Sequence, residues 1–155
     1  MGDVVIREVR DWDITLLFLN MREADFEEVR AARGDVYGAL VSAAKTSVQA
    51  WAAESHGQLL CLFGVAPISF IAGQGSPWLL GTNAMLRHRG RLIRQTPRYL
   101  ARMLELFPHL SNFVDARNVK SIRFLKAMGF EMHAPIPYGK AGEPFIPFSM
   151  GVTHV

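Results

Sequence analysis

Arginines that lie together without a neighbouring acid are the most evident source of chemistry in this sequence. Between Glu54 and Glu105 the chain has no Asp or Glu. The same interval holds His88 and six arginines: Arg87, Arg89, Arg91, Arg94, Arg98 and Arg102. Such a cluster creates a local positive field that attracts phosphate, and guanidinium binds phosphate through two parallel hydrogen bonds. The pattern fits an anion-binding site, and it fits a solvated basic helix face equally well.

A second group of polar residues is spaced around a predicted helix in the last third of the chain. Asn118, Ser121 and the pair Gly129-Phe130 follow the pattern Asn-x-x-Ser-(seven residues)-Gly-Phe. Aromatic and β-branched residues at 112–116 predict a strand, and the Asn118 side chain predicts a helix cap. Gly129 then ends the helix and Phe130 begins another strand. The unit is strand, capped helix, glycine stop and strand.

This unit resembles the second half of the Gcn5-related N-acetyltransferase (GNAT) family, in which the asparagine touches the pantetheine of acetyl-CoA. The runs 77–82, 114–118 and 121–126 are similar to those of GNAT-like proteins from short-tailed bacteriophages, some of which are internal virion proteins. The resemblance implies an α/β (α+β) fold with a mixed, mostly antiparallel sheet of about six or seven strands and helices on both faces. Residues 1–155 would form a single GNAT-like domain that uses acetyl-CoA as co-substrate and no metal.

The resemblance also implies cofactor-binding residues. In GNAT folds the strand that matches residues 79–82 splays from its neighbour, and the gap receives the pantetheine arm. The cofactor-binding candidates are Leu79, Leu80, Gly81, Thr82, Arg87, Arg89, Gly90, Arg91, Asn118 and Ser121. The pyrophosphate loop departs from the family pattern because Leu92 stands where a small residue is expected. Either arginines replace backbone amides as the phosphate clamp, or the site is lost and the arginines serve a protein or nucleic-acid partner.

Acetyl transfer to an amine needs a deprotonated amine, a polarised thioester and an acid for the departing thiolate. Many GNAT enzymes supply this acid from a tyrosine seven residues after the motif asparagine, where this chain has Leu125. The catalytic candidates are Glu54 and Asp115 as bases at strand ends, and Ser121 as a hydroxyl donor. Asp115 has a structural alternative in pairing with Arg117, and Ser121 has one in helix capping or packing.

The acids of the N-terminal third are interpreted differently. Residues 1–54 carry a net charge of −4 and residues 55–155 a net charge of +7. A predicted helix beginning at Asp25 holds several of these acids, together with the residues just before it: Glu23, Asp25, Glu27 and Glu28. They could face a cationic substrate, but a solvated surface is the favoured interpretation.

The elements that would position these residues follow from periodicity and from Gly and Pro. Helices are predicted from Asp11 or Asp13, over 25–34, over 35–44, from Thr96-Pro97 to 107, and over 119–128. Strands are predicted over 4–6, 46–54, 58–66, 78–82, 112–116, 130–133 and 145–152. Ser55-His56-Gly57 predicts a hairpin turn, and 67–76 and 134–144 predict loops. Pro147 places the last strand at a sheet edge, or at least at a position where its missing N–H is not needed.

Composition sets the limits of the interpretation. A chain of 155 residues that is half hydrophobic is one domain with a sizeable core. No apolar run is long enough to span a membrane, and the N-terminus lacks the order of a signal peptide. The single cysteine, Cys61, excludes an internal disulfide and a cysteine-based zinc cluster. The expected location is cytoplasmic, which is the host cytoplasm if the protein is phage-encoded, with a virion location left open.

Two functional interpretations remain at this point. The first is a phage-encoded GNAT-type N-acetyltransferase that transfers an acetyl group from acetyl-CoA to an unidentified amine acceptor. The alternative is a catalytically inactive GNAT-like scaffold that acts in phage virion assembly or protein binding. A phage or host protein partner and a homodimer are left open, and no membrane is expected. Nucleic acid is disfavoured because no aromatic residues are interleaved with the arginines.

Overall fold

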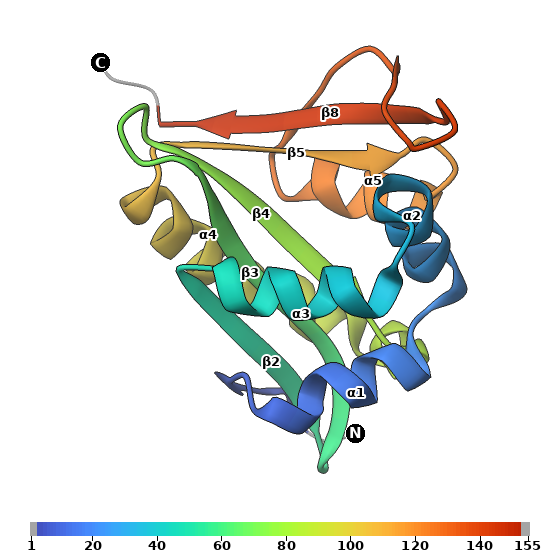
Figure 1. The fold of residues 1–155 in the computed structure, drawn as a ribbon. Coiled ribbons are helices and arrows are strands. Elements are labelled where there is room, and N and C mark those ends of the chain that lie inside the picture. The colour runs from blue at the N-terminus through green and yellow to red at the C-terminus, as the bar shows by residue number, and fades with distance from the viewer. Residues whose placement is uncertain (1–2, 153–155) are drawn as a thin grey trace.

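The computed structural model describes residues 3–152, and its central layer is a mixed eight-stranded sheet (Figure 1). The strands are β1 (Val5–Glu8), β2 (Gln49–Ser55), β3 (Gln58–Ser69), β4 (Gln74–Gly81), β5 (His109–Asp115), β6 (Glu131–Met132), β7 (Ile136–Pro137) and β8 (Pro144–Gly151). The helices are α1 (Asp11–Asn20), α2 (Glu23–Arg33), α3 (Val36–Thr46), the 3₁₀ helix η1 (Asn83–His88), α4 (Arg89–Leu106) and α5 (Val119–Ala127).

The strand order is β1-β2-β3-β4-β5-β8-β6, with β7 also paired to β8. All neighbouring strands are antiparallel except β4 and β5, which are parallel. The predicted fold class is confirmed. The sheet exceeds the expected six or seven strands because β6 and β7 are two-residue strands that pair with different ends of β8.

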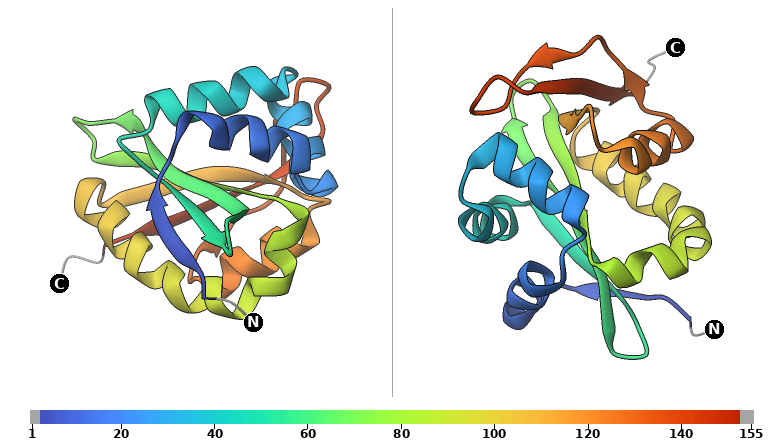
Figure 2. Two further views of the ribbon diagram at one scale, coloured as in Figure 1. Left: turned by 90° about the horizontal axis from the view of Figure 1, so that it is seen from below. Right: turned by 90° about the vertical axis from the view of Figure 1, so that its right-hand side faces the viewer.

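Helices cover both faces of the sheet. Figure 2 shows α1 and α3 on one face and α4 and α5 on the other. Two apolar clusters form accordingly: Leu17, Leu40 and Leu80 belong to the cluster on the α1–α3 face, and Leu100 and Met103 belong to the cluster under α4. The burial of these apolar faces is the main stabilising contribution to the sandwich of helices and sheet.

The turn between β2 and β3 has the predicted chemistry. His56 and Gly57 have φ angles of 50° and 75°, respectively, and together they make the two-residue connection between the strands. Turns with two positive φ values match the right-handed twist of a hairpin, and Gly accepts such a conformation without steric cost. The following β3–β4 hairpin is longer than predicted, since β3 runs to Ser69 and β4 starts at Gln74.

Helix α4 begins earlier than the sequence suggested. It starts at Arg89, so the Thr96-Pro97 pair lies within the helix and does not begin it. The Thr96 hydroxyl donates to the Leu92 carbonyl at 2.7 Å and is not a cap. Because the helix is continuous, three arginines spaced four residues apart share one exposed face: Arg94, Arg98 and Arg102.

Strand β8 is not an edge strand, so that part of the prediction is wrong. It pairs with β5 on one side and with β6 and β7 on the other. The reason is the register at Pro147: β6 pairs only as far as Phe148, and β7 begins again at Phe145. The backbone nitrogen of Pro147 therefore faces a break between two partner strands, where a missing N–H costs no ladder bond.

Candidate functional site

The two parallel strands of the sheet separate soon after they meet. Pairing between β4 and β5 is limited to Gln74 with His109 and Gly75 with Leu110. Beyond these pairs the strands diverge (Figure 1), and a cavity of about 510 Å³ lies between and beside them. The predicted splay of the strand at 78–82 from its neighbour is thus present in the fold. At the narrow end of the gap the Asn112 side-chain amide of β5 donates to the Pro77 carbonyl of β4 at 2.8 Å, and the cavity opens beyond this bridge.

Alternate residues of β4 direct their backbone N–H and C=O groups into this gap. The Thr82 N–H donates to the Leu60 carbonyl at 2.8 Å, so the alternate residues Pro77, Leu79 and Gly81 direct their backbone groups away from β3. Pro77 has no N–H, and Gly81 uses both of its groups in bonds to the α2 region. In the described part of the chain, Leu79 alone of these three keeps an N–H and a C=O without a partner.

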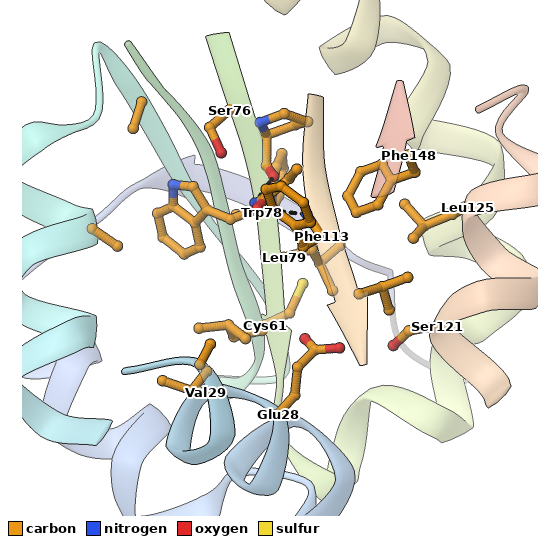
Figure 3. A pocket seen from close by; sticks show the side chains of 18 of the residues that line it. Glu28, Val29, Cys61, Ser76, Trp78, Leu79, Phe113, Ser121, Leu125 and Phe148 are labelled. Carbon is orange, nitrogen blue, oxygen red and sulfur yellow. Dashed lines mark hydrogen bonds between the residues drawn. The ribbon is translucent and has the colours of Figure 1, made fainter. Parts of the chain in front are cut away.

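Two carboxylates of α2 reach across the open end of the gap. Asp25 accepts from the Gly81 N–H of β4 at 2.9 Å, and Glu28 accepts from the Asp115 N–H of β5 at 2.8 Å. Asp25 is also paired with Arg22, at 3.2 Å and almost fully buried. Figure 3 shows the Glu28 carboxylate pointing from α2 into the cavity, between Cys61 and Ser121. These acids replace the missing inter-strand bonds and at the same time place negative charge in the cavity.

Asn118 joins the two carboxylates. Its side-chain amide donates to Asp25 at 3.2 Å and to Glu28 at 3.3 Å. The predicted side-chain cap is therefore wrong: Asn118 occupies the N-cap position of α5, but it makes no capping hydrogen bond. Its Oδ1 atom is buried and has no protein partner in the part of the chain that the structure describes. A buried acceptor without a donor is costly, so this atom is a candidate for contact with a ligand.

The surroundings of the two carboxylates alter their protonation. Burial raises the pKa of Glu28 to about 7, with a smaller contribution from the negative charges of Asp25 and Asp115 and an opposing one from its hydrogen bonds. Burial also raises the pKa of Asp25, against the opposing effect of Arg22. Asp25 has a cation and two further donors around it, whereas Glu28, with a pKa of about 7, can gain and lose a proton near neutral pH.

A smaller, cationic cavity of about 60 Å³ adjoins the gap on the α4–α5 face. Arg22, Arg89 and Lys120 line it, and Ser121 borders both cavities. It lies beside the N-terminus of α4, which follows η1 directly and where the helix dipole favours an anion. The arrangement is suited to phosphate groups at one end and to an uncharged chain running toward Leu79 at the other.

The remaining residues of the predicted phosphate loop have different environments. Arg87 is exposed on η1, and Gly90 is exposed with open space around its Cα. Arg91 forms an ion pair with Asp3 at 3.1 Å. Leu92, the residue that departs from the family pattern, is buried and lines both cavities. Its bulk therefore points inward and leaves the helix terminus accessible.

Of the residues predicted on β4, Leu79 and Leu80 line the large cavity, whereas Gly81 and Thr82 have structural contacts. A Cβ on Gly81 would collide with the Met85 side chain, so the close approach predicted there is made by the protein itself. The Thr82 hydroxyl donates to the carbonyls of β3 at 2.8 and 3.0 Å.

The predicted catalytic residues are not brought together. Glu54 bonds to Arg7 at 2.9 Å on β2, and it is not among the residues that line the cavity. The Asp115 side chain is held by Arg117 at 2.7 Å, and these bonds lower the pKa of that carboxyl against the opposing effect of burial. Ser121 lines the cavity, and its hydroxyl has no hydrogen-bond partner among the described residues.

Asp25 and Glu28 are the residues whose role the sequence analysis missed. Both were included in a solvated acidic surface, whereas the structure buries Asp25 and turns Glu28 into the cavity. One sequence signal was available: Arg22, Asp25 and Glu28 recur at a spacing of three, which places a cation and two acids along one helix face. Cys61 also borders the cavity, but burial raises the pKa of its thiol to about 12, so it stays protonated.

No protein-family model and no curated protein matches the sequence. Among solved structures, the fold is similar to that of the spermidine N-acetyltransferase of Vibrio cholerae in complex with CoA and spermine, with a TM-score of 0.71 and 11% identity over 96% of this chain and 95% of that one. The ribosomal-protein-alanine N-acetyltransferase of Brucella melitensis gives a TM-score of 0.72 and 15% identity, over 96% and 99%. Ard1 from Thermoplasma volcanium gives 0.70 and 16%, over 97% and 99%.

The chain therefore has the fold of the GNAT acetyltransferases. At these identities the likeness concerns the fold, and activity must be argued from the site. Within residues 3–152 no helix is long and apolar enough to cross a membrane, and no group of three or more His, Cys, Asp or Glu side chains could hold a metal ion.

Proposed function

We propose that the protein is an N-acetyltransferase that uses acetyl-CoA. The observation that carries this proposal is the separation of β4 from β5, which leaves the Leu79 peptide groups and the buried Asn118 Oδ1 without partners in the described chain beside an open cavity. An extended chain with amide groups can add to such a strand by main-chain hydrogen bonds. The pantetheine arm of CoA is a chain of this kind.

The residues present fit acetyl-CoA at both of its ends. Arg89 and Lys120, with the N-terminus of α4, would hold the phosphates. The N–H and C=O of Leu79 and the Oδ1 atom of Asn118 would receive the amides of the arm. The bound thioester supplies an activated acetyl group.

The protein's own groups perform the proton transfers. Glu28 as a carboxylate accepts a proton from the acceptor ammonium, which frees the nitrogen lone pair for attack; the new C–N bond forms as the C–S bond breaks. A base with a pKa of about 7 is half ionised at neutral pH and so is matched to this task. Ser121 is the hydroxyl on the cavity wall that can donate to the departing sulfur, in place of a tyrosine. It regains a proton from the nitrogen, which loses its second proton as the amide forms, and Glu28 returns its proton to the solvent.

Calorimetric titration with acetyl-CoA tests the binding site. Arg89→Ala and Lys120→Ala should each raise the dissociation constant about tenfold, which corresponds to about 1.4 kcal/mol. Arg98→Ala is the matched control, because Arg98 is exposed on α4 and lines neither cavity. Equal weakening by all three variants would point to nonspecific charge, and the absence of heat in the unmodified protein would contradict the proposal.

The second candidate function is a GNAT-like scaffold that does not catalyse transfer. The observation in its favour is Leu125, an apolar residue that lines the cavity at the position where the family resemblance implies a proton-donating tyrosine. A role as a phage virion or assembly protein belongs to this candidate. Binding of acetyl-CoA without release of free thiol, over a broad panel of amines, would favour it over the enzyme.

A further inference from the structure

The half of the cavity on the α2–α3 side of the sheet has aromatic walls. Trp78 of β4 forms one wall, and its indole N–H donates to the Ser47 hydroxyl at 2.8 Å, which fixes the ring. Phe113 of β5 forms another; it is stacked on Tyr138, with ring centroids 4.0 Å apart and planes inclined by 11°. Trp78 and Phe113 border the same space in Figure 3. Rigid rings of this kind bind flat apolar groups by stacking and by burial of area.

The opposite wall leaves room for such a group. It is made by one face of α3, where the side chains that line the cavity are small: Ala39, Ser42, Ala43 and Thr46. Their spacing of three and four residues places them on a single helix face. The total cavity of about 510 Å³ lies within the range of ~300–1,000 Å³ usual for small-molecule sites. Space is therefore available beside the rings, and not only around the predicted pantetheine position.

The charges of this half restrict the ligand further. Among the described residues that line the cavity, the acids are Glu28 and Asp35, and the one base is Arg33. Asp35 is occupied as the N-cap of α3, where it accepts from the Gly38 N–H at 3.1 Å. Asp35 keeps its charge but is exposed at the start of α3, so Glu28 is the carboxylate that lies inside the cavity, and the exposed Arg33 beside Asp35 disfavours further cations there. A ligand with an amine at Glu28 and an apolar body fits this arrangement.

We infer that the acceptor is an arylalkylamine: a primary amine that meets Glu28, on a short alkyl chain whose aromatic ring lies between Trp78, Phe113 and the small residues of α3. This inference rests on the proposed function. The residues that carry it, Trp78, Phe113 and the small residues of α3, differ from Arg89, Lys120 and Leu79, which carry the proposed cofactor site. Acceptor binding and cofactor binding can therefore be tested separately.

Acetyl transfer by the full chain is measured as release of free thiol from acetyl-CoA. The acceptors are 2-phenylethylamine and tryptamine, compared with spermidine and ethanolamine. We expect kcat/KM for the two aromatic amines to exceed that for the other two by at least about tenfold, since only the aromatic amines bury a ring between these walls. A preference for spermidine or ethanolamine would overturn the inference.

Variants of α3 and α2 locate the effect. Ser42→Phe fills the space beside the rings and should lower kcat/KM for 2-phenylethylamine at least tenfold, with the acetyl-CoA affinity unchanged. Lys45→Phe is the matched control, an exposed position on the same helix that does not line the cavity. Arg33→Glu should raise kcat/KM for spermidine severalfold. Equal effects of Ser42→Phe and Lys45→Phe would count against the acceptor site.

Direct binding separates failure of the inference from failure of the proposed function. 2-Phenylethylamine, titrated in the presence of CoA, should quench tryptophan fluorescence, and Trp78→Phe should remove that change. If acetyl-CoA binds but the amine gives no quenching and no transfer, the acceptor class is wrong and the cofactor site stands. If acetyl-CoA does not bind, the proposed function fails and the acceptor inference fails with it; quenching by the amine alone would then show an amine-binding site and no acceptor site.

Discussion

Glu28 is the residue whose environment has the most direct chemical consequence. The Asp115 N–H and the Asn118 amide stabilise its charged form, whereas burial and the nearby charges of Asp25 and Asp115 stabilise its neutral form. The balance gives a pKa of about 7, which suits a base that must be ionised before the amine arrives and protonated after it has attacked. The Asn118 amide donates to this carboxylate while its own Oδ1 atom has no partner among the described residues, so the proposed base and the proposed cofactor contact are joined by one side chain.

Replacement of Glu28 should change the pH dependence of the reaction if Glu28 is the general base. In the unmodified protein, kcat/KM should rise with pH through an acid limb near pH 7 and then level, because the carboxylate form is the active one. Glu28→Gln should lower kcat/KM by about 10²–10⁴, the usual contribution of a general base, and should remove that limb. A limb near pH 7 that persists in the variant would assign it to another group. Glu27→Gln is the control on the same helix.

The same substitution should make the protein more stable at alkaline pH. A folded-state pKa raised above the unfolded value of 4.5 means that the folded state holds the extra proton between pH 4.5 and 7, so stability falls as pH rises through that window. Gln carries no such penalty. In urea unfolding, Glu28→Gln should exceed the unmodified protein by about 1–3 kcal/mol at pH 8 and match it at pH 4.5. A constant difference at both pH values would mean that burial of the charge is not the cause.

At the scale of elements, the sequence predicted those features that local chemistry determines. The hairpin at His56-Gly57, the helices on both faces and the splayed strand pair were all predictable from turn residues, periodicity and the family pattern. The start of α4 was not predictable from the sequence, because Thr96-Pro97 is a typical helix start that tertiary packing overrides. The inward direction of the Asp25 and Glu28 side chains was also not predictable, since an acidic helix is normally solvated. These acids turn inward because the separated strands leave backbone N–H groups of β4 and β5 without strand partners, and the acids accept from them.

The claim that β4 offers its backbone to a ligand can be tested by removing one N–H. Leu79 and Phe63 form a non-hydrogen-bonded pair of the β3–β4 ladder, in which the two residues do not exchange backbone hydrogen bonds. Leu79→Pro therefore leaves this ladder intact, as Pro77 on the same strand already does. We expect the variant to fold and to bind acetyl-CoA about tenfold more weakly, which corresponds to the loss of one hydrogen bond of ~1.4 kcal/mol. Leu79→Ala controls for the lost side chain. Equal affinities of the two variants would show that the N–H is not used.

At the scale of the whole molecule, the uneven charge of the sequence has a structural explanation. Residues 1–54, with net charge −4, supply Asp25 and Glu28 through α2; residues 55–155, with net charge +7, supply Arg89 and Lys120 through α4 and α5. The gap between β4 and β5 lies between the acids of α2 and the cations of α4 and α5. The acids therefore line the α2 side of the gap and Arg89 and Lys120 its α4–α5 side, and the Arg22–Asp25 ion pair lies where the two sides meet.

Occupation of this path should stabilise the whole fold. At an acetyl-CoA concentration 100 times its dissociation constant, binding to the native state alone contributes about 2.7 kcal/mol. For a chain of this length, each kcal/mol raises the melting temperature by roughly 2–4 °C, so an increase of about 5–11 °C is expected in a thermal scan. The Arg89→Ala, Lys120→Ala double variant, scanned at the same ligand concentration, should show a much smaller increase, because the ligand no longer saturates it. The same rise with free adenosine 3′,5′-bisphosphate would place the stabilisation at the phosphates alone, and no rise with either ligand would contradict a cofactor path between β4 and β5.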